Sequence, residues 1–255
     1  MRKTALSLLL AASMAPLMAQ AETIRFGIDG NYPPFAKQAA DGHLEGFDVD
    51  IALSLCEAMK VTCEIVPQEW DGLIPALNAG KFDAILSSMQ ITDERKKAVD
   101  FTNRYYQTPS RMVTKNGVVK VTKDDFSGKR IGVLRASTEE RYAKDHWGKK
   151  GVQIVNYGKV TEAFLDLKTE RLDGVFVDQV VADTEFLKRG GTPAYAFAGP
   201  GISDTKYFGY GAGIAVKKGN APLRERLNKA IETIRSNGVY QKVQKKYFNF
   251  DIYGS

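Results

Sequence analysis

The sequence has few of the side chains on which metal and nucleophilic chemistry depend. Its 255 residues include two cysteines and two histidines, and no Gly-x-Ser-x-Gly segment of the kind that carries a hydrolase serine. Cys56 and Cys63 have no histidine near them, which makes a poor zinc site. His43 lies in a glycine-rich segment typical of an exposed turn. We therefore expect no metal, no cofactor and no catalytic residue.

The sequence also lacks a hydrophobic run long enough to span a bilayer, which takes about 20 consecutive apolar residues. The longest run, 5–18, follows Arg2 and Lys3 and leads into Ala-Gln-Ala at 19–21. A short apolar run between positive charges and small residues is typical of a cleaved secretory signal. Residues 1–21 are therefore predicted to be a signal peptide, and the remaining 255 − 21 = 234 residues to be soluble in the periplasm.

No block of like charge is present. The 36 Lys and Arg residues outnumber the 30 Asp and Glu residues by six, and loss of Arg2 and Lys3 with the signal lowers the formal charge from +6 to +4. Basic and acidic residues are interleaved, as in KDD at 123–125 and TEER at 138–141. This pattern indicates a solvated mixed surface and argues against nucleic-acid binding.

The two cysteines are expected to form a disulfide, because both follow the signal in a chain bound for an oxidising compartment. In the chain-entropy model, closing so short a loop between Cys56 and Cys63 stabilises the fold by roughly 2–3 kcal/mol. The disulfide would thus reinforce one local element.

Short β-branched or apolar runs alternate with helical patterns along the chain. Such alternation is typical of an α/β fold with largely parallel sheets. The first half of the chain gives the clearest series of predicted strands, at 24–28, 63–66 and 84–86, and of helices, at 47–59, 73–78 and 92–99.

A faint internal repeat predicts two similar lobes. RFGID at 25–29 is echoed by RIGVL at 130–134, and LNAGKFDA at 77–84 by LKTERLDG at 167–174. Each copy contains a strand, a turn, a later helix and another strand. Apolar strands resemble one another, so chance similarity is the alternative.

The C-terminal part of the chain is expected to return to the first lobe. A glycine-rich segment at 208–213 leads into a strand and an amphipathic helix at 221–236, whose apolar positions have helical spacing. Two chain crossings would then form a hinge, and a cleft between lobes is a common place for a small-molecule site. We predict lobe 1 as 22–109 plus 212–255 and lobe 2 as 110–211.

Two segments have the composition of a carboxylate receptor. LSSMQITDER at 86–95 places Arg95 in the first turn of a short helix beside hydroxyl groups and free backbone N–H groups. In the second lobe, Ser137 and Glu140 form a capping-box pattern that sets the N–H groups of Ser137 and Thr138 at the positive end of a helix. The plain alternatives are a surface arginine and an ordinary helix cap.

Together with these segments, several motifs carry a family resemblance: DGNYPPF at 29–35, GFDVD at 46–50, WDGLIPAL at 70–77, ITDER at 91–95 and KYF at 246–248. Over essentially the whole mature chain, the sequence resembles the polar-amino-acid family of type II periplasmic binding proteins. It is most similar to the branch that binds lysine, arginine, ornithine and histidine, including the ending FDIYG at 250–254. The resemblance implies two lobes, each a mixed, mostly parallel sheet flanked by helices, and delivery of the ligand to a membrane ABC permease by a monomer.

The resemblance also implies roles for individual residues. Arg95 would bind the ligand α-carboxylate with the backbone of Gln90 and Thr138, and Asp178 would bind the α-ammonium with the carbonyl of Ser88. Tyr32 and Trp70 would pack on either side of the aliphatic part of the ligand, with Leu134 beneath it. Asp29, with Ser87 nearby, would face the cationic group at the far end of the ligand side chain.

These roles agree with elementary electrostatics. A zwitterion taken from water needs a charged partner at each end, because an unpaired buried charge is costly. Aromatic faces beside a cation add about 0.5–2 kcal/mol. Asp29 would favour lysine, arginine or ornithine over an apolar side chain. An aspartate at a strand end is otherwise a turn or cap residue.

The chain departs from this branch at Gln90, where the closest relatives have serine or threonine, and at Glu139, where they have glutamine. A larger side chain at Gln90 would reduce the space at the α-end of the ligand. An opine or another N-substituted amino acid is therefore an alternative ligand. Glu139 would add negative charge near the cleft and suit a cationic ligand.

Two other functions share this fold. A cyclohexadienyl-dehydratase-like enzyme is disfavoured, because only His43 and His146 are present and Arg95 with Asp178 fits amino-acid capture. A sensor that docks a receptor is the second alternative, and the sequence does not identify its partner.

Overall fold

The computed structural model describes residues 22–116, 127–189 and 194–254. The predicted signal peptide at 1–21 lies outside these residues. Within them, no helix is both long and apolar enough to cross a membrane.

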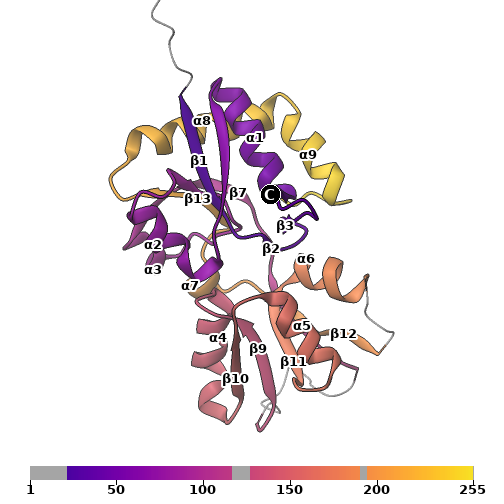
Figure 1. Ribbon diagram of the computed structural model, residues 1–255. Coiled ribbons are helices and arrows are strands. Elements are labelled where there is room, and N and C mark those ends of the chain that lie inside the picture. The colour runs from indigo at the N-terminus through magenta and orange to yellow at the C-terminus, as the bar shows by residue number, and fades with distance from the viewer. Residues whose placement is uncertain (1–21, 117–126, 190–193, 255) are drawn as a thin grey trace, which may run out of the picture.

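Two five-stranded sheets form the centres of two lobes, which lie one above the other in Figure 1. The first has the order β5-β1-β6-β13-β7: Thr62–Pro67, Thr23–Ile28, Ala84–Ile85, Ala212–Lys217 and Val99–Tyr106. The second has the order β10-β9-β11-β8-β12: Gln153–Tyr157, Arg130–Leu134, Gly174–Asp178, Ser110–Lys115 and Tyr195–Ile202. A small antiparallel sheet, β2-β3-β4 (Asn31–Tyr32, Ala36–Gln38, Leu44–Glu45), adjoins the first.

Both large sheets follow one topology. The first three strands in each order pair in parallel, the fourth is antiparallel to the third, and the fifth is antiparallel to the fourth. Four of the five strands therefore run in one direction. The predicted α/β fold with mixed, mostly parallel sheets is confirmed.

The internal repeat appears as matching ion pairs in the two lobes. Arg25 at the start of β1 donates from its backbone N (2.9 Å) and Nε (3.1 Å) to Asp83 before β6. Arg130 at the start of β9 donates from the same two atoms to Asp173 before β11, at 2.8 and 3.3 Å. The similarity of the two segments is thus structural, and each Arg–Asp pair joins the second and third strands in the order of its sheet, β1 with β6 and β9 with β11.

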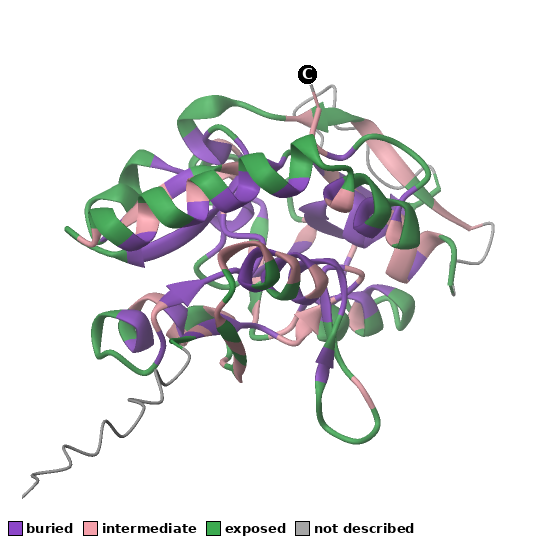
Figure 2. Ribbon diagram, turned by 90° about the horizontal axis from the view of Figure 1, so that it is seen from above, coloured by how far each residue is buried: buried purple, intermediate pink, exposed green. Residues whose placement is uncertain are grey.

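Helices cover the sheets, and buried residues concentrate on the strands and on the inner faces of these helices (Figure 2). The first lobe has α1 (Phe47–Met59), α2 (Leu73–Asn78), α3 (Asp93–Lys96), α8 (Ala221–Ser236) and α9 (Val239–Tyr247). The second has α4 (Thr138–His146), α5 (Val160–Lys168), α6 (Gln179–Val181) and α7 (Thr205–Phe208). The remaining turns of helix are η1 (Trp70–Gly72), η2 (Gly148–Lys150) and η3 (Ala182–Leu187).

Local sequence signals account for the ends of several helices. Helix α8 begins and ends as predicted, with Asn220 accepting from the N–H of Leu223 at its start. The face predicted to be apolar is buried, at Leu223, Leu227, Ile231 and Ile234. Helix α3 is shorter than the predicted 92–99, because Val99 already belongs to β7.

The chain passes between the sheets twice. Residues 107–109 join β7 of the first sheet to β8 of the second, and residues 209–211 join α7 to β13 of the first sheet. The strand that follows each passage becomes the fourth strand of its sheet. The two crossings lie close together between the lobes (Figure 1), since Ala212, directly after the second, pairs with Tyr106, directly before the first.

Candidate functional site: a pocket between the lobes

The pocket lies where the parallel strands of both sheets end. In the first lobe, Asp29 follows β1, Trp70 follows β5 and Ser87 follows β6; in the second, Leu134 ends β9 and Thr138 begins α4. Carboxyl ends of parallel strands meet at one edge of a sheet and are a common place for ligand sites. Residues of both lobes line one cavity there, and a cleft between lobes is a common place for a small-molecule site.

Ten of the eleven residues predicted to bind the ligand line this cavity. They are Asp29, Tyr32, Trp70, Ser87, Ser88, Gln90 and Arg95 from the first lobe, and Leu134, Ser137 and Thr138 from the second. Their roles toward a ligand remain predictions. The eleventh, Asp178, lies directly after the lining residue Val177 at the end of β11.

The Arg95 guanidinium is held by several contacts. Its Nη1 donates to the Gln90 carbonyl at 3.1 Å, and its Nη2 reaches the Ala136 carbonyl of the second lobe at 3.4 Å. The guanidinium carbon lies 5.0 Å from the centroid of the Trp70 ring, in a cation–π arrangement. Burial lowers the pKa of Arg95 to about 10, so the group is still charged at neutral pH. A fixed cation at this point can receive a carboxylate.

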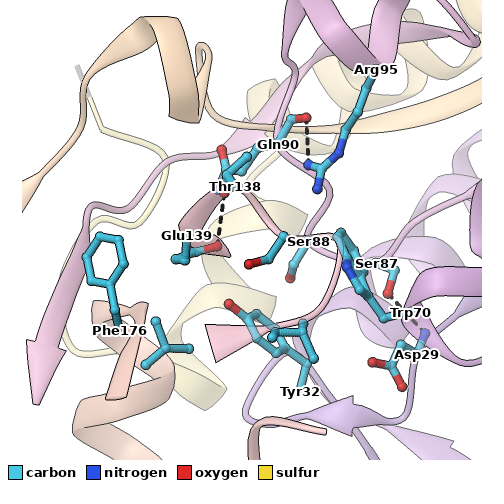
Figure 3. Close-up of a pocket in the computed structure, with 13 residues that line it drawn as sticks. Asp29, Tyr32, Trp70, Ser87, Ser88, Gln90, Arg95, Thr138, Glu139 and Phe176 are labelled. Atoms are coloured by element: carbon cyan, nitrogen blue, oxygen red, sulfur yellow. Dashed lines mark hydrogen bonds between the residues drawn. The ribbon is translucent and has the colours of Figure 1, made fainter. Parts of the chain in front are cut away.

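Asp29 supplies a buried carboxyl group away from Arg95, with Ser87, Ser88 and Trp70 between them in Figure 3. Its backbone N donates to Ser87 Oγ at 2.9 Å. Asn31 donates from its backbone N (3.1 Å) and its Nδ2 (2.9 Å) to Asp29 Oδ1. Burial raises the pKa of Asp29, and these bonds oppose the rise. The arrangement leaves Oδ2 available to a cationic group.

Ser88 is fixed from behind by a buried network. Its φ is +53°, a left-handed conformation that is rare for serine. Its N–H donates to Tyr105 Oη at 2.9 Å and its hydroxyl to Asp48 Oδ2 at 2.9 Å, while Tyr105 donates to Asp48 Oδ1 at 2.8 Å. Since its hydroxyl is used in this way, the carbonyl is the polar group that Ser88 can offer a ligand, as the resemblance implies.

Asp178 is a buried acidic group in the second lobe. Its carboxylate accepts from the hydroxyl of Thr108 in the first crossing and from the N–H groups of Val180 (2.7 Å) and Val181 (3.3 Å). Burial, with a smaller contribution from nearby Glu139, raises the pKa of Asp178 to about 7. Without a bound cation this group is therefore only partly ionised at neutral pH.

The helix cap in the second lobe differs in one detail from the expected one. Ser137 Oγ accepts from the N–H of Glu140 at 3.0 Å, as the capping-box pattern predicts. The N–H of Ser137, however, donates to the Leu134 carbonyl at 3.3 Å, and the Glu140 carboxylate accepts from Ala136. Thr138 is therefore the better backbone donor for a ligand.

Three lining residues were not among those predicted to bind the ligand: Glu139, which was expected only to add charge near the cleft, Phe176 and Val177. Glu139 accepts hydrogen bonds from Ser110 Oγ at 2.6 Å and Thr138 Oγ1 at 3.0 Å. Its place next to Thr138 in the sequence was the feature that could have identified it as a site residue. Phe176 and Val177 lie in β11, which is buried throughout. Nothing in such a strand shows which side faces a cavity.

A pocket formed by the edges of two sheets, with charged groups of both signs inside it, defines a two-lobed protein that binds a small polar molecule. The sequence profile of the bacterial extracellular solute-binding proteins, family 3, matches residues 24–250. The chain belongs to that family.

Individual relatives agree with this assignment. The L-arginine-binding protein of Pseudomonas aeruginosa is 51% identical and aligned over 100% of both chains. The lysine/arginine/ornithine-binding periplasmic protein of Escherichia coli is 42% identical, over 98% of this chain and 97% of its own. A solved arginine-specific periplasmic binding protein of Salmonella typhimurium superposes with a TM-score of 0.83, at 35% identity, covering 90% of this chain and 100% of its own. The two-lobed periplasmic binding protein fold is thereby confirmed.

Proposed function

We propose that this chain captures a free cationic amino acid in the periplasm and delivers it to a membrane ABC importer. The observation that carries the proposal is the pair of charged groups in one pocket: Arg95 for the α-carboxylate and the buried Asp29 for a distal cation. The relatives named for arginine and for lysine, arginine and ornithine support the same class of ligand.

The roles of the other residues follow from their positions. Tyr32 and Trp70 present ring faces to the aliphatic stem, and Asp178 with the Ser88 carbonyl accepts from the α-ammonium. Closure of the lobes about the crossings at 107–109 and 209–211 brings these groups to the ligand together. We infer lobes of 22–109 plus 212–255 and 110–211, a cleaved signal at 1–21, a monomer, and no nucleic-acid partner.

A thermal-shift panel on refolded, ligand-free protein tests the class of ligand, because a ligand that binds the folded state raises the melting temperature. Arginine, lysine, ornithine and histidine are expected to raise it, and leucine and glutamate are not. Opines in the same panel test the N-substituted alternative. Prephenate and arogenate, assayed for turnover, test the enzyme alternative.

Two variants then test separately how the α-carboxylate and the distal cation of the ligand are recognised. Arg95→Ala is expected to abolish binding of every α-amino acid. Asp29→Asn is expected to weaken arginine and lysine by about tenfold or more, because each loses a buried charged hydrogen bond, and to leave neutral amino acids unaffected. Titration calorimetry measures both. Unchanged arginine and lysine affinity in Asp29→Asn would show that this carboxylate does not select the ligand.

A further inference from the structure

The side chain of Gln90 points at the backbone of the second crossing. The hydrogen-bond network orients its amide so that Nε2 donates to two carbonyl oxygens, those of Phe208 at 3.2 Å and Gly211 at 3.2 Å. The Gln90 main chain carries separate contacts, since its carbonyl accepts from Arg95 and it forms a β-bridge with Ala212. One side chain therefore connects the turn that holds the ligand-binding arginine to the passage between lobes.

Phe208 belongs to the second lobe, whereas Gly211 lies in the second crossing, next to the first lobe. Phe208 ends α7, and its ring packs against Tyr142 (5.5 Å between centroids) and Phe176 (6.1 Å) in the second lobe. Gly211 is fixed to the first lobe, because its carbonyl also accepts from the N–H of Ile91 at 2.8 Å. A hinge motion would move the Phe208 carbonyl relative to Gln90 and leave the Gly211 carbonyl in place.

Two positions in the second crossing, Gly209 and Gly211, have a left-handed backbone and no room for a side chain. Gly209 has a φ of +63°, and a Cβ there would lie 1.8 Å from the carbonyl oxygen of Ile91. Gly211 has a φ of +101°, and a Cβ there would lie 2.6 Å from the carbonyl oxygen of Tyr106. Both glycines are closely packed in the stretch that the Gln90 amide bridges, so this part of the second crossing has a defined backbone conformation.

We propose that Gln90 is a positioning residue that fixes the closed arrangement of the lobes through its amide bond to Phe208, and that it does not act by contacting the ligand nitrogen. The bond to Phe208 is made when the lobes are closed and lost when they open. It therefore raises the closed fraction of the protein even before a ligand binds. This inference depends on the proposed closure and not on the identity of the ligand.

The primary experiment compares the ligand-free wild-type protein with Gln90→Met, which keeps the length of the side chain and removes the donor. Spin labels at two exposed positions, Asn78 in the first lobe and Lys149 in the second, report the distance between lobes by pulsed electron resonance. One net hydrogen bond corresponds to about a two- to tenfold shift in an equilibrium. The closed-to-open ratio is expected to fall by that factor in Gln90→Met.

Gln241→Met is the matched control. Gln241 also donates to a backbone carbonyl, that of Arg235 at 3.3 Å, but both residues lie in the first lobe, near the C-terminal helices. This variant loses the same kind of bond without affecting the hinge, so its distance distribution should equal that of the wild type. Gln90→Asn, which keeps the amide but is one methylene shorter, should behave like Gln90→Met.

Ligand affinity provides a second readout. If Gln90 acts through closure, Gln90→Met weakens arginine and Nα-methylarginine by the same factor, mainly through faster dissociation. A loss confined to arginine, with an unchanged distance distribution in the ligand-free protein, would overturn the proposal and show direct contact with the α-nitrogen. An unchanged distribution together with unchanged affinities would overturn it as well.

Discussion

At the scale of single residues, three buried aspartates lie at the pocket or directly behind its lining residues. Asp29, Asp178 and Asp48 all have a raised pKa because of burial, to about 7 for Asp178 and about 8 for Asp48. Asp48 already accepts hydrogen bonds from the hydroxyl groups of Ser88 and Tyr105, and it therefore holds Ser88 in position. Asp29 and Asp178 are the groups that a dicationic ligand can stabilise in their charged form.

Asp178 predicts a pH dependence of binding. Its pKa in the ligand-free fold, about 7, is above the ordinary value of 3.8, so ionisation of this group destabilises the ligand-free fold as pH rises through that interval. A bound α-ammonium favours the ionised form. Binding must therefore release a proton below about pH 7, and affinity for arginine should fall as pH is lowered, by at most about tenfold per unit for this group.

Calorimetry of arginine binding between about pH 5 and pH 8 measures this effect. Asp178→Asn cannot titrate, so it should bind weakly at the upper end and lose this group's contribution to the slope. Asp29 contributes a slope of the same sign, because its pKa is raised too. An identical slope in the wild type and in Asp178→Asn would rule out the assignment of the α-ammonium to Asp178.

At the scale of elements, the disulfide is the clearest local reinforcement. Cys56 near the end of α1 is bonded to Cys63 in β5, as predicted, with a Cα–Cα distance of 5.8 Å. Cys63 is the second residue of β5, so the disulfide lies at the start of this strand. Trp70 and the pocket lie beyond the opposite end of the strand. The bond should therefore affect stability more than ligand binding.

Replacing both cysteines by alanine tests this expectation. The free energy of unfolding should fall by roughly 2–3 kcal/mol, because the unfolded chain regains the entropy of an open loop. Urea denaturation of the variant and of the wild type, each without reducing agent, measures the difference. Arginine affinity should stay within about twofold, and a large loss of affinity would mean that α1 and β5 position the pocket more directly than their distance suggests.

At the scale of the whole molecule, contacts between the lobes are expected to contribute very different free energies to closure. Arg135 of the second lobe pairs with Asp71 of the first at 3.2 Å, but the two side chains are 55% and 42% exposed. Such surface pairs contribute about 0–1 kcal/mol. Arg95 and Asp178 are instead expected to act through the ligand, which joins the lobes only when it is bound.

Arg135→Ala is accordingly expected to weaken arginine by no more than about fivefold. Small-angle scattering should show that arginine still reduces the radius of gyration of this variant, as it should for the wild type. Calorimetry gives the affinity on the same samples. A loss as large as that expected for Arg95→Ala would indicate that the exposed pair, and not the ligand, drives closure.

The sequence by itself determined the alternation of strands and helices, the repeat, the bounds of α1 and α8 and most of the residues around the pocket. These features depend on local pattern, such as the apolar face of α8, or on motifs that keep fixed distances along the chain, such as 86–95. Arg95 was found from the composition of the segment 86–95, whereas the role of Asp29 was implied by the family resemblance.

The tertiary structure decided what depends on residues far apart in the chain. Only folding brings Gln90 within hydrogen-bond distance of Phe208 and Gly211, and Asp178 within reach of Thr108. It also places Glu139, Phe176 and Val177 at the cavity. The physical reason is that the direction of a side chain, and the desolvation that raises the pKa of Asp178, are set by neighbours from both crossings and both lobes.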